Sequence, residues 1–165
     1  VAWEMADALA LQLVQKGKSA GSVVVLVGYG VTAEEGAVMR AGEGAWWRGW
    51  PSDGGSHRFV SSTSSRQQIV DGAMRVFDGH VMRDRPVRRL NVTLDGVMDD
   101  GAPGVQLDLF ADVGALEREK RRQEAVNAVK EKFGRNALLR ATDLLPEATA
   151  RERNQQIGGH RSGES

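Results

Sequence analysis

The chain has 165 residues, of which 41% are hydrophobic and 27% are charged, so it can bury a core and is not expected to be wholly disordered. Its 22 basic and 22 acidic residues cancel, so bulk charge does not point to nucleic acid. The absence of cysteine excludes disulfides and cysteine-bound zinc, and it fits a cytoplasmic location. No apolar run approaches the ~20 residues that span a bilayer, so we expect no membrane partner.

The first two predicted elements are a helix and a central strand. Residues 3–16 predict an amphipathic helix, because Met5, Leu9 and Leu13 recur every fourth position. Residues 22–29 form a β-branched run that is apolar at both odd and even positions. Such a run favours a central strand that is covered on at least one face.

Residues 30–56 are rich in glycine and predict an irregular or hairpin insertion. Three tryptophans, Trp46, Trp47 and Trp50, lie within it. They could form a small apolar cluster that pins the insertion, or a platform on which nucleic-acid bases stack. The sequence leaves both interpretations open.

A second strand and a second helix follow the insertion. Residues 57–62 are a plausible strand, and Thr63, Ser64 and Ser65 offer hydroxyl groups that could cap a helix. Residues 65–80 predict that helix. Its apolar face comprises Ile69, Ala73, Val76 and Phe77.

A third strand is predicted at residues 87–94, after Pro86. Leu90, Val92 and Leu94 would point to one face, and Arg89, Asn91 and Thr93 to the other. Helix, strand, strand, helix and strand together predict an α+β fold, a small two-layer sandwich with two helices on one face of the sheet. The opposite face of that sheet would be polar and solvated.

An apolar pentapeptide follows an acidic linker that contains glycine and proline. The linker is residues 99–104, and the pentapeptide is Gln106-Leu107-Asp108-Leu109-Phe110. Five residues cannot form a core, so they fold back onto the domain or dock into another protein. A charged helix is then predicted at residues 116–133, followed by a short helical segment and a frayed end.

The sequence predicts no metal site. His57, His80 and His160 are far apart and lack a ligand pattern. The aspartates at 95, 99, 100 and 108 surround the linker, where solvated turns are the expected structure.

Three segments resemble one family, the ImpB/MucB/SamB (UmuC-like) branch of the bacterial Y-family translesion DNA polymerases. Residues 86–94 (PVRRLNVTL) resemble the last strand of its little finger domain, and Gln106–Phe110 resembles its sliding-clamp-binding peptide. Residues 133–141 and 149–160 resemble a C-terminal tail found in this branch.

The resemblance implies a fold, two partners and a set of site residues. Residues 1–98 would be a little finger domain that lacks its first strand, residues 99–111 a linker carrying the clamp peptide, and residues 112–165 a helical tail. The sheet face would contact the phosphates of template-primer DNA. The DNA-binding residues would be Arg58, Ser62, Arg88, Arg89, Asn91 and Thr93.

The clamp-binding residues would be Gln106, Leu107, Asp108, Leu109 and Phe110. No catalytic residue and no cofactor are expected in this chain. Nucleotidyl transfer with Mg²⁺ would belong to the palm domain of a polymerase acting in translesion synthesis and the SOS response. The alternative is a stand-alone module that binds the clamp or a regulator. The basic cluster Arg118, Lys120, Arg121 and Arg122 could follow phosphates or form a solvated helix face.

Overall fold

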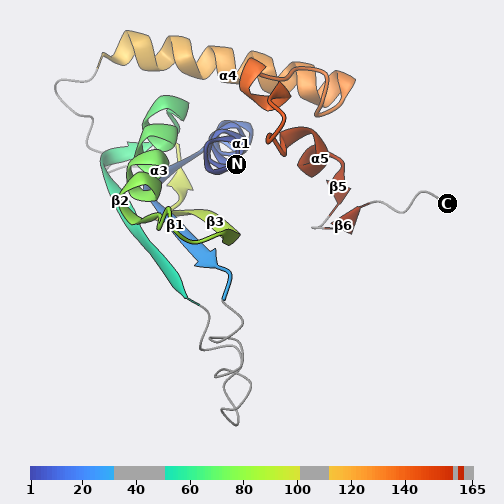
Figure 1. Cartoon of the computed structure of the whole chain (residues 1–165). Helices are drawn as coiled ribbons and strands as arrows, with labels where there is room; N and C mark the ends of the chain where they lie inside the picture. The colour runs from blue at the N-terminus through green and yellow to red at the C-terminus, as the bar shows by residue number, and fades with distance from the viewer. Residues whose placement is uncertain (32–50, 101–111, 158–159, 162–165) are drawn as a thin grey trace.

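The computed structural model describes residues 1–31, 51–100, 112–157 and 160–161 (Figure 1). The main elements are α1 (Ala2–Gln15), β1 (Lys18–Tyr29), β2 (Ser52–Thr63), α3 (Arg66–His80), β3 (Val87–Asp95), β4 (Met98–Asp99) and α4 (Val113–Phe133). The tail contains a 3-10 turn, η1 (Ala141–Leu144), the short helix α5 (Ala150–Asn154), β5 (Gln156–Ile157) and β6 (His160–Arg161). None of the helices within these ranges is long and apolar enough to cross a membrane.

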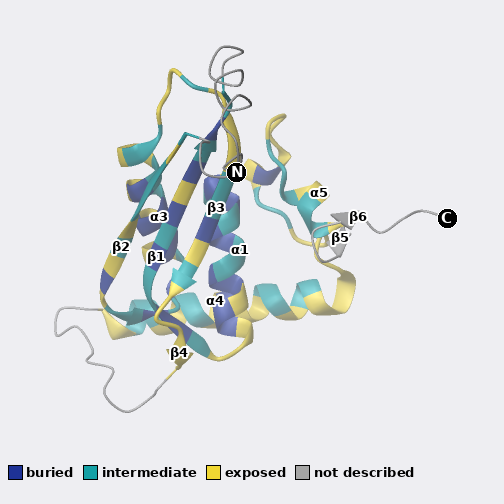
Figure 2. Cartoon of the chain, turned by 90° about the horizontal axis from the view of Figure 1, so that it is seen from below, coloured by how far each residue is buried: buried dark blue, intermediate teal, exposed yellow. Residues whose placement is uncertain are grey.

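The sheet is antiparallel, in the order β2-β1-β3, and β4 pairs with the start of β1. The predicted β-branched strand therefore occupies the central position. Its inward residues Val23, Val25, Val27 and Tyr29 are fully buried. Helices α1 and α3 cover that face (Figure 2). The predicted α+β sandwich with two helices on one face is confirmed.

Helix and strand ends are set by identifiable local contacts. Ser65, one of the predicted hydroxyl caps, accepts a hydrogen bond from the backbone N–H of Gln68 at 3.3 Å. The buried Tyr29 hydroxyl joins the end of β1 to the end of α3. It donates to the carbonyl of His80 at 3.2 Å and accepts from the N–H of Met82 at 2.8 Å.

Strand β2 begins earlier than the sequence predicted. Residues 52–56 were expected to lie in the glycine-rich insertion, but they pair with β1 from Gly28 back to Val24. Gly54 is required there, because a Cβ atom at this position would lie 2.3 Å from the carbonyl oxygen of Val25. The glycines therefore mark close packing, not a turn.

Helix α4 forms a third layer that the sequence did not predict. It packs across α1, on the side away from the sheet (Figure 1). The Asn127 side chain donates to the carbonyl of Leu11 at 3.0 Å. Glu119 accepts from the Ser65 hydroxyl at 2.7 Å and from the N–H of Gln67 at 2.9 Å, so its carboxylate caps α3.

The start of α4 is also tied to the end of the sheet. Lys120 forms an ion pair with Asp100, and this hydrogen-bonded contact raises the pKa of Lys120 above its ordinary value. Gly134 adopts a positive φ of 94° at the other end of the helix, where the chain turns into the tail. Phe133, the last residue of the helix, is exposed.

Two buried carboxylates on α1 hold the tail. Glu4 accepts hydrogen bonds from the N–H and the hydroxyl of Thr149 and lies 3.7 Å from Arg153. Asp7 contacts Arg66 of α3 and Arg140 of the tail, and both guanidinium groups lie over the Trp3 ring. The described part of the tail is therefore anchored to the first helix through charged groups.

Candidate nucleic-acid interface

The candidate interface is the sheet face opposite α1 and α3, called the open face below. No helix of the described chain lies over it (Figure 2). The residues that face outward from β1 are Ser22, Val24, Leu26 and Gly28. Leu26 is 50% exposed although it is in the central strand, which shows how open this face is.

The three polar residues predicted on β3 do share the open face. Thr93 pairs with Val24, Asn91 with Leu26, and Arg89 with Gly28. The alternate residues Leu90, Val92 and Leu94 pack into the core, as predicted. The alternation of β3 is therefore confirmed, and it presents a guanidinium, an amide and a hydroxyl group along one edge of the sheet.

A β-bulge brings Arg88 beside Arg89. Tyr29 pairs with Val87 and the neighbouring Gly28 pairs with Arg89, so Arg88 is an extra residue in β3. Regular alternation would direct two consecutive side chains to opposite faces. With the bulge, both arginines line the same hollow in the surface.

That hollow lies at one end of the open face and has a volume of about 540 Å³. Besides the two arginines, it is lined by Leu26, Val27, Gly28, Tyr29, Ser52 and Asn91. It thus combines two permanent positive charges with neutral donors and the exposed apolar side chain of Leu26. Guanidinium, amide and hydroxyl groups are the common protein donors to nucleic-acid phosphates, and an apolar side chain can contact a sugar.

The two residues predicted on β2 are placed differently. Arg58 pairs with Ser22 and is exposed on the open face, at the opposite end from the hollow. Ser62 lies beyond an irregularity in the pairing, and its hydroxyl is 3.5 Å from the sulfur of Met98. The strand changes register between Arg58 and Ser62, so the pairing with β1 does not place Ser62, and its position on the open face stays a prediction.

The charge of the open face is mostly basic. Arg58, Arg88 and Arg89 are exposed on it, and Asp95 is the acidic residue that pairs with Ser22 at the far end. Asp53 belongs to the helix side, where its carboxylate lies 3.1 Å from the ring of His80. A phosphate backbone across this face would meet arginines at both ends.

Sequence reasoning missed the bulge, although one signal was present. An isolated glycine within a strand often marks a bulge or a close backbone approach. Gly28 does both here, since a Cβ atom on it would lie 3.3 Å from the Cβ of Arg89. The hollow residues Leu26 and Ser52 carried no such signal, because only the pairing of distant strands brings them together.

Two predicted features lie outside the described residues. These are the pentapeptide Gln106–Phe110 and the tryptophans at 46, 47 and 50.

The residues of the basic cluster on α4 lie in different surroundings. Lys120 pairs with Asp100, Arg118 lies 3.9 Å from Asp112, and Arg122 lines a groove against α1 and α3.

The family model of the impB/mucB/samB family C-terminal domain matches residues 1–109. This range contains all strands of the sheet, β1 to β4, and the two helices that cover it, α1 and α3. The match ends before α4. The described tail thus lies outside the matched range, and its resemblance to this family stays a prediction.

Curated relatives agree with the family match. DNA polymerase IV 2 of Halalkalibacterium halodurans is 33% identical over 109 residues, covering 64% of this chain and 25% of that protein. DNA polymerase IV of Pelotomaculum thermopropionicum is 35% identical over 91 residues, covering 55% and 21%. The putative UV-damage repair protein UvrX of Bacillus subtilis is 32% identical over 114 residues, covering 66% and 26%.

The chain spans about a quarter of the length of these relatives. No solved structure matches it significantly. The family match covers about two thirds of the chain and coincides with the sheet, its covering helices and the open face. The chain therefore belongs to the impB/mucB/samB family, and its sheet and first two helices are the C-terminal domain of that family.

Proposed function

We propose that this chain is the DNA-binding and clamp-tethering C-terminal part of a translesion DNA polymerase that acts in the cytoplasm in DNA repair. The observation that carries the proposal is the open face, an uncovered sheet surface with arginines at both ends. It lies in a domain of the impB/mucB/samB family that is similar to parts of DNA polymerase IV proteins. The remainder of such a polymerase would supply the catalytic carboxylates and Mg²⁺. This part would hold the template-primer DNA, and its clamp peptide would keep the polymerase at the primer end.

The DNA contact proposed is to phosphates and not to base edges. Arginine, asparagine and threonine along β3 can donate to phosphate oxygens wherever the backbone passes. Phosphate contacts carry no direct sequence information, which suits an enzyme that must accept damaged templates. The hollow beside Arg88 and Arg89 is where we expect the strongest contact, because two guanidinium groups meet there.

The test is a salt titration of binding to a labelled primer-template duplex. We expect the Arg88→Ala/Arg89→Ala variant to bind more weakly and to lower the slope of log K against log salt by about two, since each lost phosphate contact contributes about 0.9. A matched control, Arg75→Ala/Arg121→Ala, also removes two exposed arginines, but from the helical side. An unchanged slope in the first variant, or an equal drop in the control, would contradict phosphate binding by the open face.

The pentapeptide Gln106–Phe110 is proposed as the clamp tether. Leu109 and Phe110 would fill an apolar pocket on the sliding clamp, and the Gln106 amide would fix the register. A tether raises the effective concentration of polymerase at the primer end without adding DNA contacts.

The tether is tested by measuring binding of the chain to a bacterial sliding clamp. We expect Leu109→Ala/Phe110→Ala to weaken binding by about 30-fold or more, as for two central anchor residues. The matched control is Leu144→Ala/Leu145→Ala, which truncates two apolar residues that are exposed in the tail. If both variants bind the clamp like the parent chain, the contact lies elsewhere, and the DNA-binding proposal stands on its own titration.

A further inference from the structure

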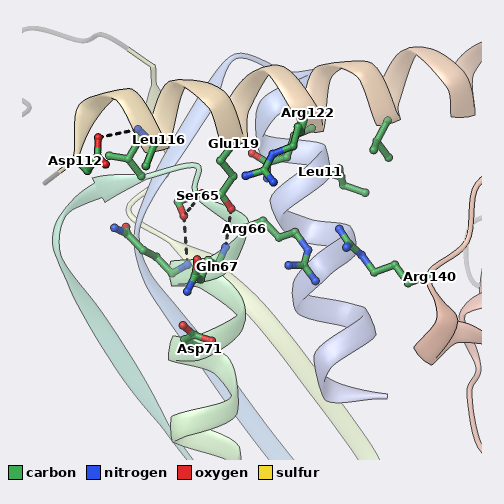
Figure 3. A pocket seen from close by; sticks show the side chains of 14 residues that line it. Leu11, Ser65, Arg66, Gln67, Asp71, Asp112, Leu116, Glu119, Arg122 and Arg140 are labelled. Carbon is green, nitrogen blue, oxygen red and sulfur yellow. Dashed lines mark hydrogen bonds between the residues drawn. The ribbon is translucent and has the colours of Figure 1, made fainter.

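A groove between the three helices is a second candidate binding site, on the opposite side of the molecule from the open face. It has a volume of about 680 Å³ and is formed by α1, the first turns of α3, the inner side of α4 and the tail (Figure 3). Neither the proposed DNA contact nor the proposed clamp peptide uses it. Its size lies within the range of sites that hold small molecules or a few side chains of a peptide.

The groove has a basic end. Arg66 of α3, Arg122 of α4 and Arg140 of the tail gather there from three separate elements (Figure 3). Arg66 and Arg140 share the single carboxylate of Asp7. No ion pair of Arg122 is seen within the described ranges, and the carboxylate paired with the other two arginines is that of Asp7. The remaining acidic residues of the lining, Asp71, Asp112 and Glu119, lie nearer the first turns of α3 and α4 (Figure 3). An additional anion would be attracted to this end.

The groove also contains an acceptor without a donor. The Gln123 side chain is 4% exposed and lines the groove, yet its Oε1 atom has no hydrogen-bond partner in the described structure. The other end of the amide is fixed, because Nε2 donates to the carbonyl of Ser64 at 3.4 Å. A buried carbonyl oxygen left unpaired is costly, which favours a ligand that brings an N–H or O–H group.

Glu119 already occupies the N-terminus of α3. Its carboxylate accepts hydrogen bonds from the Ser65 hydroxyl and the N–H of Gln67. A new anion would therefore not bind at that helix end. It would bind at the arginine end instead. Leu116 and Val126 also line the groove, one turn before Glu119 and one turn after Arg122 along α4, and they offer apolar contact to aliphatic side chains.

We propose that this groove binds an acidic peptide segment of a partner protein. A glutamate or aspartate carboxylate would lie against Arg122 and its two neighbours, and the adjoining backbone N–H would donate to Gln123 Oε1. An ionised carboxylate has only acceptors, whereas a peptide carries a backbone N–H donor beside its carboxylate. Because the groove and the open face lie on opposite sides of the helical layer, the peptide and DNA could bind together.

The proposal can be tested by nuclear magnetic resonance on the full chain labelled with ¹⁵N. The probe is the capped peptide acetyl-Leu-Glu-Glu-Ala-amide, compared with its uncharged counterpart acetyl-Leu-Gln-Gln-Ala-amide. We expect saturable shifts of the Arg122 Nε–H and Gln123 side-chain amide signals with the glutamate peptide alone. Adding primer-template duplex should leave these shifts in place.

Two variants make the test specific. Arg122→Gln should weaken binding of the glutamate peptide at least tenfold, while Arg121→Gln, an exposed neighbour outside the groove, should leave it unchanged. The dispersion of the amide spectrum shows that each variant is folded. Gln123→Met should also weaken binding, because it removes the acceptor and keeps the length of the side chain.

Three results would overturn the proposal. One is the absence of saturable shifts with the glutamate peptide, and another is equal binding of the glutamine peptide. The third is binding of inorganic phosphate as tight as that of the glutamate peptide, which would make the arginine end a general anion patch. A failure here leaves the DNA and clamp proposals untouched, since neither involves the groove.

Discussion

The bidentate contact between Asp7 and Arg140 provides the sharpest test of how the tail is held. Arg140 Nη2 lies 3.1 Å from Asp7 Oδ1, and Arg140 Nε lies 3.2 Å from Oδ2. The Asp7 residue is 8% exposed, whereas the Arg140 side chain is 37% exposed. The pair is therefore intermediate between a surface ion pair, at about 0.2–1 kcal/mol, and a buried pair, whose disruption costs about 3–5 kcal/mol.

From this geometry we expect a coupling free energy of about 1–2 kcal/mol between the two side chains. Arg140→Gln alone should destabilise the chain by about 1–2 kcal/mol, because it removes that contact and leaves Arg66 paired with Asp7. Asp7→Asn should cost about 2–3 kcal/mol, because it leaves two guanidinium groups beside Trp3 without a counter-charge. The double variant should cost less than the sum of the single variants.

The assay is urea unfolding of the parent chain, the two single variants and the double variant, monitored by far-ultraviolet circular dichroism. A loss of 1 kcal/mol should lower the melting temperature by about 2–4 °C in a chain of this size. Limited proteolysis supplies a local readout, since Arg140→Gln should expose the tail to cleavage before the sheet domain. Additive single-variant effects, or unchanged cleavage of the tail, would refute the conclusion that Asp7 anchors it.

Three further substitutions follow from contacts in the fold. Tyr29→Phe leaves two backbone groups without their hydroxyl partner and should cost about 1–3 kcal/mol in urea unfolding; a cost near zero would mean that water replaces the hydroxyl. Gly54→Ala should destabilise by about 2 kcal/mol through its clash with β1, whereas Gly79→Ala, with open space around it, should be neutral or stabilising; equal effects would contradict the close packing. Glu119→Gln should cost about 1 kcal/mol through the lost charge at the α3 N-terminus, and Glu117→Gln on the same helix serves as the control that should change little.

The sheet domain was largely predictable because its signals are local. The β-branched run gave β1, the alternation of Leu90, Val92 and Leu94 gave the faces of β3, and Ser65 was one of the three hydroxyl residues offered as caps for α3. Each signal depends only on residues that are neighbours in the chain. The start of β2 was missed because Gly54 and Gly55 normally indicate a turn, and only the neighbouring strand and His80 reveal that no side chain would fit there.

The packing of the tail could not be predicted from local patterns. Glu4 and Asp7 look like ordinary acidic residues in the first turns of a helix, where solvated carboxylates are common. Their burial depends on Thr149, Arg153 and Arg140, more than 130 positions away. The residues next to a carboxylate in the sequence therefore do not indicate that a distant segment will bury it.

Because Arg88 is an extra residue in β3, the charge at this end of the open face can change while the core residues of the strand stay the same. Without that one residue, Val87 and Arg89 would become consecutive partners of Tyr29 and Gly28, and β3 would pair regularly along its length. A one-residue deletion there would remove a positive charge while Leu90, Val92 and Leu94 kept their places. Insertions and deletions at this point are thus a route by which related chains could change the charge of the open face without repacking the hydrophobic interior.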